Sequence, residues 1–229
     1  MTRPSLIAVA HGTRCATGQA QVRRLVTAVR QHRPELDVTL AYLDIERPHL
    51  RTVAARLRRP AVAVPLLFAA GYHVRADIPA ALRGAPVAAA PPLGPDPALT
   101  AALTARLAQA DALDADAIVL AAAGSSDPRA VADVREVARD LAAATARPVV
   151  AGYASAAAPR VDEAVTMVRA AGAERVAIAA MLLADGQFYR SLGAAGADVL
   201  TRPLGAHPTV IDLILRRYDE ADFPLSQTG

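Results

Sequence analysis

The chain of 229 residues is poor in residue types that often mark a binding site. It has a single cysteine, Cys15, which excludes an internal disulfide and a zinc site built from cysteines. Aromatic residues make up only 3% of the sequence, and every basic residue is an arginine, scattered rather than clustered. Nucleic acids are usually held by basic patches with interleaved aromatic side chains, so this composition argues against a nucleic-acid partner.

Long hydrophobic runs are also missing, although hydrophobic residues make up 53% of the chain. No apolar run reaches the roughly 18–20 residues that span a bilayer. The first apolar stretch, residues 6–10, is ended by His11 and is too short for the core of a signal peptide. We therefore expect a cytoplasmic protein with no membrane partner. The formal net charge of +3 is compatible with a small acidic substrate.

The sequence does contain a regular alternation of strand-like and helical segments. Short apolar runs predict strands at residues 6–10, 38–43, 61–67, 86–90, 117–122, 149–153, 176–183 and 199–200. Between them, apolar residues recur at the spacing of one helix face, as at Val22, Leu25, Val26 and Val29. This alternation predicts an α/β fold of mostly parallel sheets with helices on both faces.

The second half of the sequence repeats the first. LIAVAHGTR matches IVLAAAGSSDPR, and VTLAYLDIERPHL matches VVAGYASAAAPRV. PLLFAAGYH matches MLLADGQFY with one gap, and PPLGPDPALTAAL matches RPLGAHPTVIDLI. Because the segments occur in the same order, we expect two similar halves, residues 1–112 and 113–229, each with its own sheet.

Ligand-capable side chains stand at the predicted strand ends of the first half. His11 follows the first strand, Asp44 ends the second, and His73 follows the third. The matching positions of the second half carry small or apolar groups, namely Ala123, Ser155 and Phe188. Ligands bind outside the carboxyl ends of parallel strands. We therefore predict that residues 1–112 carry the active site and that residues 113–229 are a degenerate repeat.

Two histidines and a carboxylate form a donor set for a first-row divalent metal ion such as iron, cobalt or nickel. Each residue also has a structural interpretation. A histidine after a strand can be a hydrogen-bonding turn residue, and Asp44 can cap a helix that begins near Pro48. Glu46 is a rival carboxylate that we expect to be solvated. Asp77 is expected to cap the turn that follows His73.

Other residues fit local roles better. Cys15 lies close to His11 in the sequence but is interpreted as a loop thiol. His207 and its counterpart Asp96 each precede a proline at a predicted helix start. Helix capping is therefore the expected role of both.

Taken together, these segments resemble the sirohydrochlorin chelatases, the CbiX/SirB group of class II chelatases. The resemblance rests on His-Gly-Thr after the first strand and on Tyr42-Leu43-Asp44 with a following Pro48. PLLFAAGYHVRADIP is similar to the family's Pro-x-Phe-Leu-x-x-Gly-x-His-x-x-x-Asp-Ile-Pro motif, and PPLGPDP resembles the segment before the family's next helix. The first half resembles the family closely, and the second half resembles it as a diverged copy.

The resemblance implies a chelatase that inserts Co²⁺ or Fe²⁺ into sirohydrochlorin, toward cobalamin or sirohaem. It assigns His11 and His73 as catalytic residues that bind the incoming metal and assist deprotonation of the macrocycle. The family's acidic catalytic residue carries over to Asp44, where this chain has Asp in place of the usual Glu. We expect Asp44 to orient a histidine or stabilise its charge, and direct ligation of the metal by its shorter side chain stays open. The metal is a substrate, and no permanently bound cofactor is implied.

The implied substrate is a flat macrocycle that carries many carboxylates. Arginines that flank the motifs are candidate carboxylate partners, and tyrosines are candidate flat contacts: Arg14, Arg47, Arg75, Tyr42 and Tyr72. The oligomeric state stays open. An internal repeat would let one chain build a cleft that a half-length relative makes as a dimer.

Two other enzyme classes fit these residues less well. Histidine phosphatases have an arginine directly before the histidine, where this chain has Ala10. Non-haem iron oxygenases use a His-x-Asp/Glu spacing that His11 does not show. The rival from another class is a non-catalytic carrier of metal or tetrapyrrole, derived from a chelatase. The sequence identifies neither the metal nor the pathway.

Overall fold

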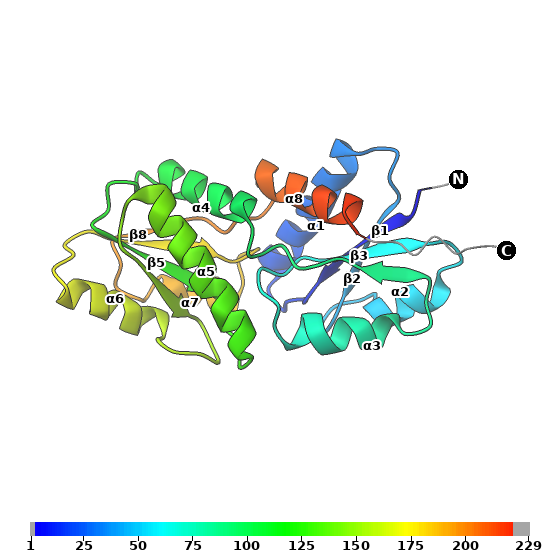
Figure 1. The fold of residues 1–229 in the computed structure, drawn as a ribbon, viewed down its shortest axis with the longest axis horizontal. Helices are drawn as coiled ribbons and strands as arrows, with labels where there is room; N and C mark the ends of the chain where they lie inside the picture. The colour runs from blue at the N-terminus through cyan, green and yellow to red at the C-terminus, as the bar shows by residue number, and fades with distance from the viewer. Residues whose placement is uncertain (1–2, 222–229) are drawn as a thin grey trace.

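The computed structural model describes residues 3–221, which form two α/β lobes side by side (Figure 1). The first repeat contains β1 (Ser5–Ala10), α1 (Ala16–His32), β2 (Val38–Tyr42), α2 (Leu50–Arg56), β3 (Ala61–Pro65), a π-helix (His73–Asp77), α3 (Ile78–Leu82), β4 (Val87–Ala89) and α4 (Pro97–Gln109). The second contains β5 (Ala117–Ala122), α5 (Pro128–Thr145), β6 (Val149–Tyr153), α6 (Val161–Ala170), β7 (Val176–Met181), α7 (Gln187–Leu192), β8 (Val199–Leu200) and α8 (Pro208–Asp219).

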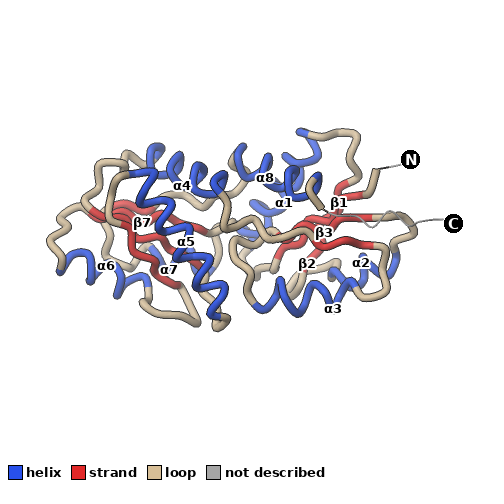
Figure 2. Tube along the Cα trace, viewed as in Figure 1, coloured by secondary structure: helices blue, strands red, loops and turns tan. Residues whose placement is uncertain are grey.

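Each repeat builds one parallel sheet, in the orders β2-β1-β3-β4 and β6-β5-β7-β8. Helices cover both faces of each sheet, as Figure 2 shows. The predicted α/β fold with two similar halves is therefore confirmed. Some strands end earlier than predicted, as β3 does at Pro65. The Leu66 N–H still donates to the Val9 carbonyl. β1 ends at Ala10, however, so the residues that follow Leu66 have no β1 residues to pair with.

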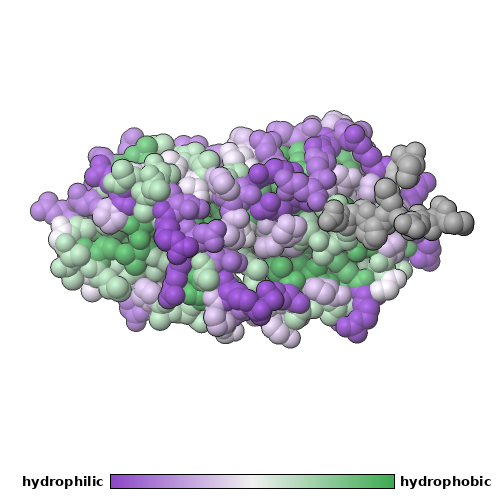
Figure 3. Space-filling model, viewed as in Figure 1, coloured by the Kyte–Doolittle hydropathy of each residue, from purple (hydrophilic) through white to green (hydrophobic). Residues whose placement is uncertain are grey.

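The central strands form because they are apolar on both faces. Every residue of β5 is buried, which is the pattern of a strand covered by helices on both sides. α5 is instead amphipathic, with buried residues at helical spacing: Ala130, Val134, Val137, Ala138 and Leu141. Figure 3 shows hydrophilic residues along its outer face. Among the described residues, no helix is long and apolar enough to cross a membrane.

The last helix of each repeat packs on the lobe of the other repeat. α4 ends the first repeat but packs against α5 and β7, whereas α8 packs against α1 and β3 (Figure 1). The two exchanged helices also pack against each other. A division of the sequence near residue 112 therefore separates the repeats, while each lobe is completed by a helix from the other repeat. The largest hydrophobic core accordingly contains residues of both halves.

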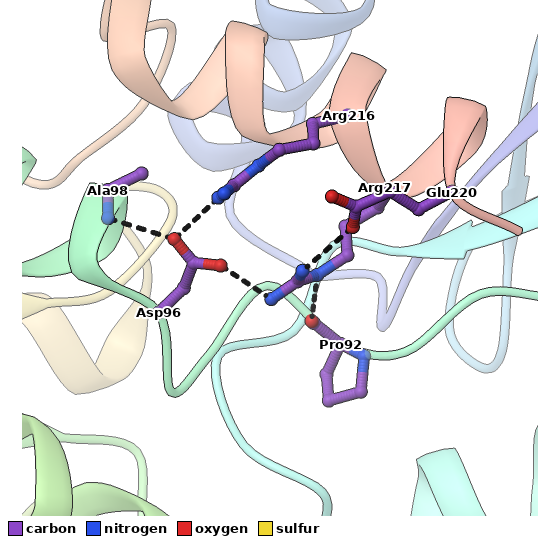
Figure 4. A network of polar contacts seen from close by, with 6 residues as sticks. All are labelled: Pro92, Asp96, Ala98, Arg216, Arg217 and Glu220. Carbon is purple, nitrogen blue, oxygen red and sulfur yellow. Dashed lines mark hydrogen bonds and ion pairs between the residues drawn. The ribbon is translucent and has the colours of Figure 1, made fainter.

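Asp96 joins the two exchanged helices (Figure 4). It caps α4 by accepting from the Ala98 N–H at 2.9 Å, and it pairs with Arg216 at 2.5 Å and Arg217 at 2.9 Å, both on α8. Burial alone would raise the pKa of Asp96, but the Ala98 N–H and the guanidinium groups outweigh it and hold that pKa below its ordinary value. His207 caps α8 through the Thr209 N–H, so the predicted capping roles of Asp96 and His207 are confirmed.

Candidate functional site

His11 stands on a tight turn directly after β1. Gly12 has a φ of +99°, and a Cβ atom there would lie 2.3 Å from the Asp44 carbonyl oxygen. The same turn in the second repeat uses Gly124, with a φ of +91°. Asp44 donates its N–H to the His11 carbonyl at 3.0 Å, which fastens the turn to the loop after β2. Only glycine combines this backbone conformation with so close an approach.

His73 begins the π-helix, and its Nδ1 lies 2.6 Å from Oδ2 of Asp77. The π-helical turn is closed by the Ile78 N–H, which donates to the His73 carbonyl. The expectation that Asp77 caps the turn that follows His73 is wrong, because its side chain bonds to the His73 ring and makes no cap hydrogen bond where that turn leads into α3. Residues i and i+4 share a helix face, so the carboxylate meets the imidazole instead.

The two histidines meet although they come from loops far apart in the sequence. Their ring centroids lie 4.6 Å apart, with the ring planes tilted by 38°. Desolvation lowers the pKa of His11 below its ordinary value of 6.5, and the charge of His73 lowers it further, against weaker opposing effects of Asp44 and Asp77. His11 is therefore neutral at pH 7, with a ring nitrogen lone pair available to a metal ion.

Asp44 does not join the histidines as a third ligand. Its side chain is exposed, and Oδ1 accepts from the N–H of the next residue, Ile45, at 2.7 Å. It does not cap α2 either, since the N-cap residue of α2 is His49. Within residues 3–221, no three His, Cys, Asp or Glu side chains are grouped closely enough to hold a metal ion. The structure thus brings His11 and His73 together as a pair, and the charge of Asp44 acts to raise the pKa of His11.

The histidine pair faces a cavity of about 500 Å³ between the two repeats. His11, Tyr72 and His73 line it from the first repeat. The second repeat contributes a wall of small and apolar residues that includes Ala122, Ala123, Ser125, Met181, Leu182 and Phe188. A volume of this size is typical of small-molecule sites, which range over roughly 300–1,000 Å³. The positions that lack ligand groups in the second repeat therefore form the opposite wall of one shared site.

The predicted substrate-binding residues are placed unequally. Tyr72 is 65% exposed and lines the cavity, whereas Tyr42 is only 3% exposed and packs in the core, where it presents no ring face to a ligand. Arg14 lines an adjoining cavity that also contains His11. Arg47 and Arg75 are exposed and line neither of these cavities. Tyr72 and Arg14 are therefore the two that line cavities shared with the histidines.

Two residues near the site differ from the sequence-based expectation or were not foreseen, and a third, Cys15, agrees with it. The side chain of Glu46 is only 10% exposed, not solvated as expected, because it accepts from the Thr13 N–H at 3.0 Å and lies 3.7 Å from Arg23. Asp133, in the second repeat, accepts from the Ala70 N–H at 2.8 Å. No sequence signal points to Asp133, since it lies 63 residues from its partner. Cys15 lies at the start of α1, as a loop thiol would.

The CbiX family model matches this chain twice, over residues 5–110 and 117–221. The two matches correspond to the two repeats. No curated protein matches the chain.

Several solved structures share the fold over nearly the whole chain. The sirohydrochlorin chelatase SirB from Bacillus subtilis subspecies spizizenii, in complex with cobalt, is 22% identical with a TM-score of 0.73, and the match covers 95% of this chain and 94% of that one. SirB from Bacillus subtilis with Fe³⁺ is 22% identical, with a TM-score of 0.74 and 95% of both chains covered.

A third structure is described as CbiX, the terminal enzyme for biosynthesis of siroheme in denitrifying bacteria. It is 25% identical with a TM-score of 0.70, and the match covers 94% of this chain and 98% of that one. Together with the family match over both repeats, these likenesses confirm the resemblance that the sequence motifs indicated. The chain belongs to the CbiX family.

Proposed function

We propose that this protein is a sirohydrochlorin chelatase that inserts Co²⁺ or Fe²⁺ into the macrocycle. The observation that carries the proposal is the pair of His11 and His73, 4.6 Å apart, on one wall of a largely apolar cavity of about 500 Å³. The family membership and the sirohydrochlorin chelatases among the structural neighbours support it.

The two histidines have different surroundings that suit different tasks. Metal insertion requires the macrocycle to lose two pyrrole protons while the ion exchanges its ligands, and one ring nitrogen cannot hold metal and proton at once. The lowered pKa of His11 keeps its ring neutral, which suits a metal ligand. His73 is hydrogen-bonded to Asp77, which fixes the orientation of its ring. We assign metal capture chiefly to His11 and proton acceptance chiefly to His73.

An incomplete set of protein ligands suits a metal that must leave. Structural metal sites hold the ion with four protein ligands, whereas reactive sites keep positions open. Two imidazole ligands leave the other coordination positions of the metal ion to water and then to the macrocycle nitrogens. The ion is thereby passed to the product instead of being retained.

The opposite wall suits a flat apolar face. It consists of small and apolar side chains from the second repeat, so the macrocycle lies against it with one face toward the histidines. Tyr72 contributes a flat contact surface next to His73, at a centroid distance of 6.4 Å. Arg14 at the adjoining cavity is the first candidate for a substrate carboxylate, and Arg47 and Arg75 are weaker candidates.

The choice of metal is the finer part of the proposal. One structural neighbour is described with cobalt and another with Fe³⁺. Imidazole ligands accept Co²⁺ and Fe²⁺ alike, so the donor set permits both and metal supply also decides the product. The product accordingly feeds cobalamin or sirohaem synthesis.

Anaerobic insertion into sirohydrochlorin, followed by absorbance with Co²⁺ and Fe²⁺ offered separately, tests the proposal. His11→Ala and His73→Ala are expected to lose turnover. His32→Ala is the matched control, because His32 is exposed near the end of α1, away from the cavity. Turnover that persists in both site variants would remove the proposed site. Tight binding of metal or macrocycle without turnover would favour the alternative function, a carrier derived from a chelatase.

A further inference from the structure

The two repeats hold each other's loops through matching hydrogen bonds. The loop after β3 donates the Ala70 N–H to Oδ2 of Asp133 on α5, at 2.8 Å. The loop after β7 donates the Asp185 N–H to Oε1 of Gln21 on α1, at 2.6 Å. Ala70 and Asp185 occupy matching positions of the repeat, as do Asp133 and Gln21. Each loop is thus held by the long helix of the opposite repeat.

The two bonds differ in the charge of the acceptor. The loop that carries His73 is held by a carboxylate, whereas the loop that carries Phe188 at the matching position is held by a neutral amide. Hydrogen bonds to an ionised acceptor are roughly twice as strong as neutral ones. The stronger acceptor therefore stands at the loop that bears the functional group.

A second carboxylate holds the other histidine-bearing loop. Glu46 accepts from the N–H of Thr13, which lies just after His11 and Gly12, and its side chain is largely buried. The matching position of the second repeat is Ala157, which has no side-chain acceptor. The loop that Ala157 faces carries Ala123 in place of a histidine. A side-chain carboxylate again accompanies the histidine and is missing where the histidine is missing.

We propose that Asp133 and Glu46 are positioning residues that set the separation of the His73 and His11 rings. Each accepts a backbone N–H of one histidine-bearing loop, and neither lines the main cavity. That the His11 and His73 pair serves metal insertion rests on the proposed function, but the positioning of the two rings is a property of the fold. Asp133 also gives the second repeat a role in the site beyond forming the opposite wall.

Removing either acceptor is expected to loosen one histidine. The loop N–H loses its partner, and the ring that the loop carries no longer keeps a fixed distance from the other. Misplacing a reacting group by about 1 Å can cost roughly 100-fold in rate. We expect Asp133→Ala and Glu46→Ala to lower kcat about 10- to 100-fold. KM for the macrocycle should change little, because the opposite wall is intact.

Nuclear Overhauser effects between the His11 and His73 ring protons measure the positioning without metal or turnover. The wild-type ring separation is short enough to give them. They should weaken or vanish in Asp133→Ala and Glu46→Ala. Gln21→Ala is the matched control, because it breaks the equivalent bond of a loop that carries no histidine, and it should keep them. Asp133→Asn and Glu46→Gln retain an acceptor oxygen and should largely restore them.

Unchanged Overhauser effects in both alanine variants would overturn the proposal, and so would an equal weakening in Gln21→Ala. Circular dichroism checks that each variant is folded. If an alanine variant is not, the Asn and Gln variants carry the test, and a vanished Overhauser effect despite the retained acceptor oxygen would contradict the proposal. If wild-type protein inserts no metal, the proposed chelatase function fails while the Overhauser effects still decide the positioning. The two failures are therefore distinguishable.

Discussion

Nδ1 of His73 lies 2.6 Å from Oδ2 of Asp77, one π-helical turn further along the chain. A histidine bound through Nδ1 to a carboxylate has a fixed ring orientation and presents Nε2 outward. Asp77 thereby decides where the free nitrogen of His73 points.

Asp77→Ala should lower the rate of metal insertion roughly 10- to 100-fold, as is typical when the partner of a functional histidine is removed. Without that partner the ring of His73 would no longer be held in one orientation. Asp77→Asn should retain part of the activity, since an amide oxygen still accepts from Nδ1–H. The measurement is steady-state insertion of Co²⁺ into sirohydrochlorin. Asp140→Ala, an exposed acid on α5, is the control, and an equal loss there would contradict the role of Asp77.

His11 should titrate below 6.5 when its ring protons are followed by NMR across pH. Desolvation disfavours the charged ring, and the nearby charge of His73 disfavours it further. Replacing His73 by alanine removes that repulsion and exposes the ring to more water, so the midpoint should move up toward 6.5. A His11 midpoint above 6.5 in wild-type protein would contradict the desolvated environment.

Gly12→Ala should destabilise the protein more than Gly172→Ala. The two glycines have nearly the same φ, +99° and +98°, so both substitutions incur similar backbone strain of about 1–3 kcal/mol. At Gly172 a Cβ meets nothing within 4 Å, but at Gly12 it would overlap the Asp44 carbonyl oxygen at 2.3 Å. The overlap should add about 1–3 kcal/mol. Urea unfolding measures the free energy of unfolding of each variant. Equal losses in the two variants would show that the Gly12 turn shifts to accommodate a Cβ atom at little cost.

Asp96→Ala should destabilise the protein by about 3 kcal/mol, because the buried Asp96 carboxylate is the partner of Arg217, whose side chain is only 12% exposed, and of the more exposed Arg216. Asp127→Ala is a matched control. Both aspartates cap a helix that begins with proline, but Asp127 bonds only to Arg129 of its own helix, while Asp96 also pairs with Arg216 and Arg217 of α8. The control should cost less, because it removes only a helix cap. Equal losses would mean that the ion pairs between the exchanged helices add nothing.

The contribution of Asp96 should also depend on pH. Its pKa is lowered in the folded protein, so its stabilisation is fully present above the ordinary value of 3.8 and is lost as pH falls through the lower folded value. The difference in unfolding free energy between wild type and Asp96→Asn should therefore be constant at neutral pH and shrink below 3.8. A difference that stays constant down to the acid limit would contradict the lowered pKa.

Much of the fold and part of the site follow from local sequence. The apolar runs predict the strands because a buried parallel strand must be apolar on both faces, as β5 is. The repeat predicts the two sheets, and the position of His11 and His73 after strands predicts that they meet at one edge. Their roles as metal ligands and the carboxylate contacts of Arg14, Arg47 and Arg75 stay predictions.

The partners of individual side chains could not be read in the same way. Asp77 and Glu46 were placed by local rules for caps and exposed acids, but Asp77 binds His73, and Glu46 is buried beneath the His11 turn. Tyr42 was a candidate contact surface, but its strand position turns its ring into the core. The direction in which each of these side chains points depends on how the strands and loops pack in the folded protein.

The sequence by itself determined the secondary structure, the repeat and the histidine-bearing strand ends, because hydrophobic periodicity and turn residues act over short distances. Only the tertiary structure decided that α4 and α8 exchange lobes and that Asp133 reaches the loop before His73. It also decided that the second repeat closes the cavity. These features join residues far apart in the chain, and they exist only once both sheets have packed around a common core.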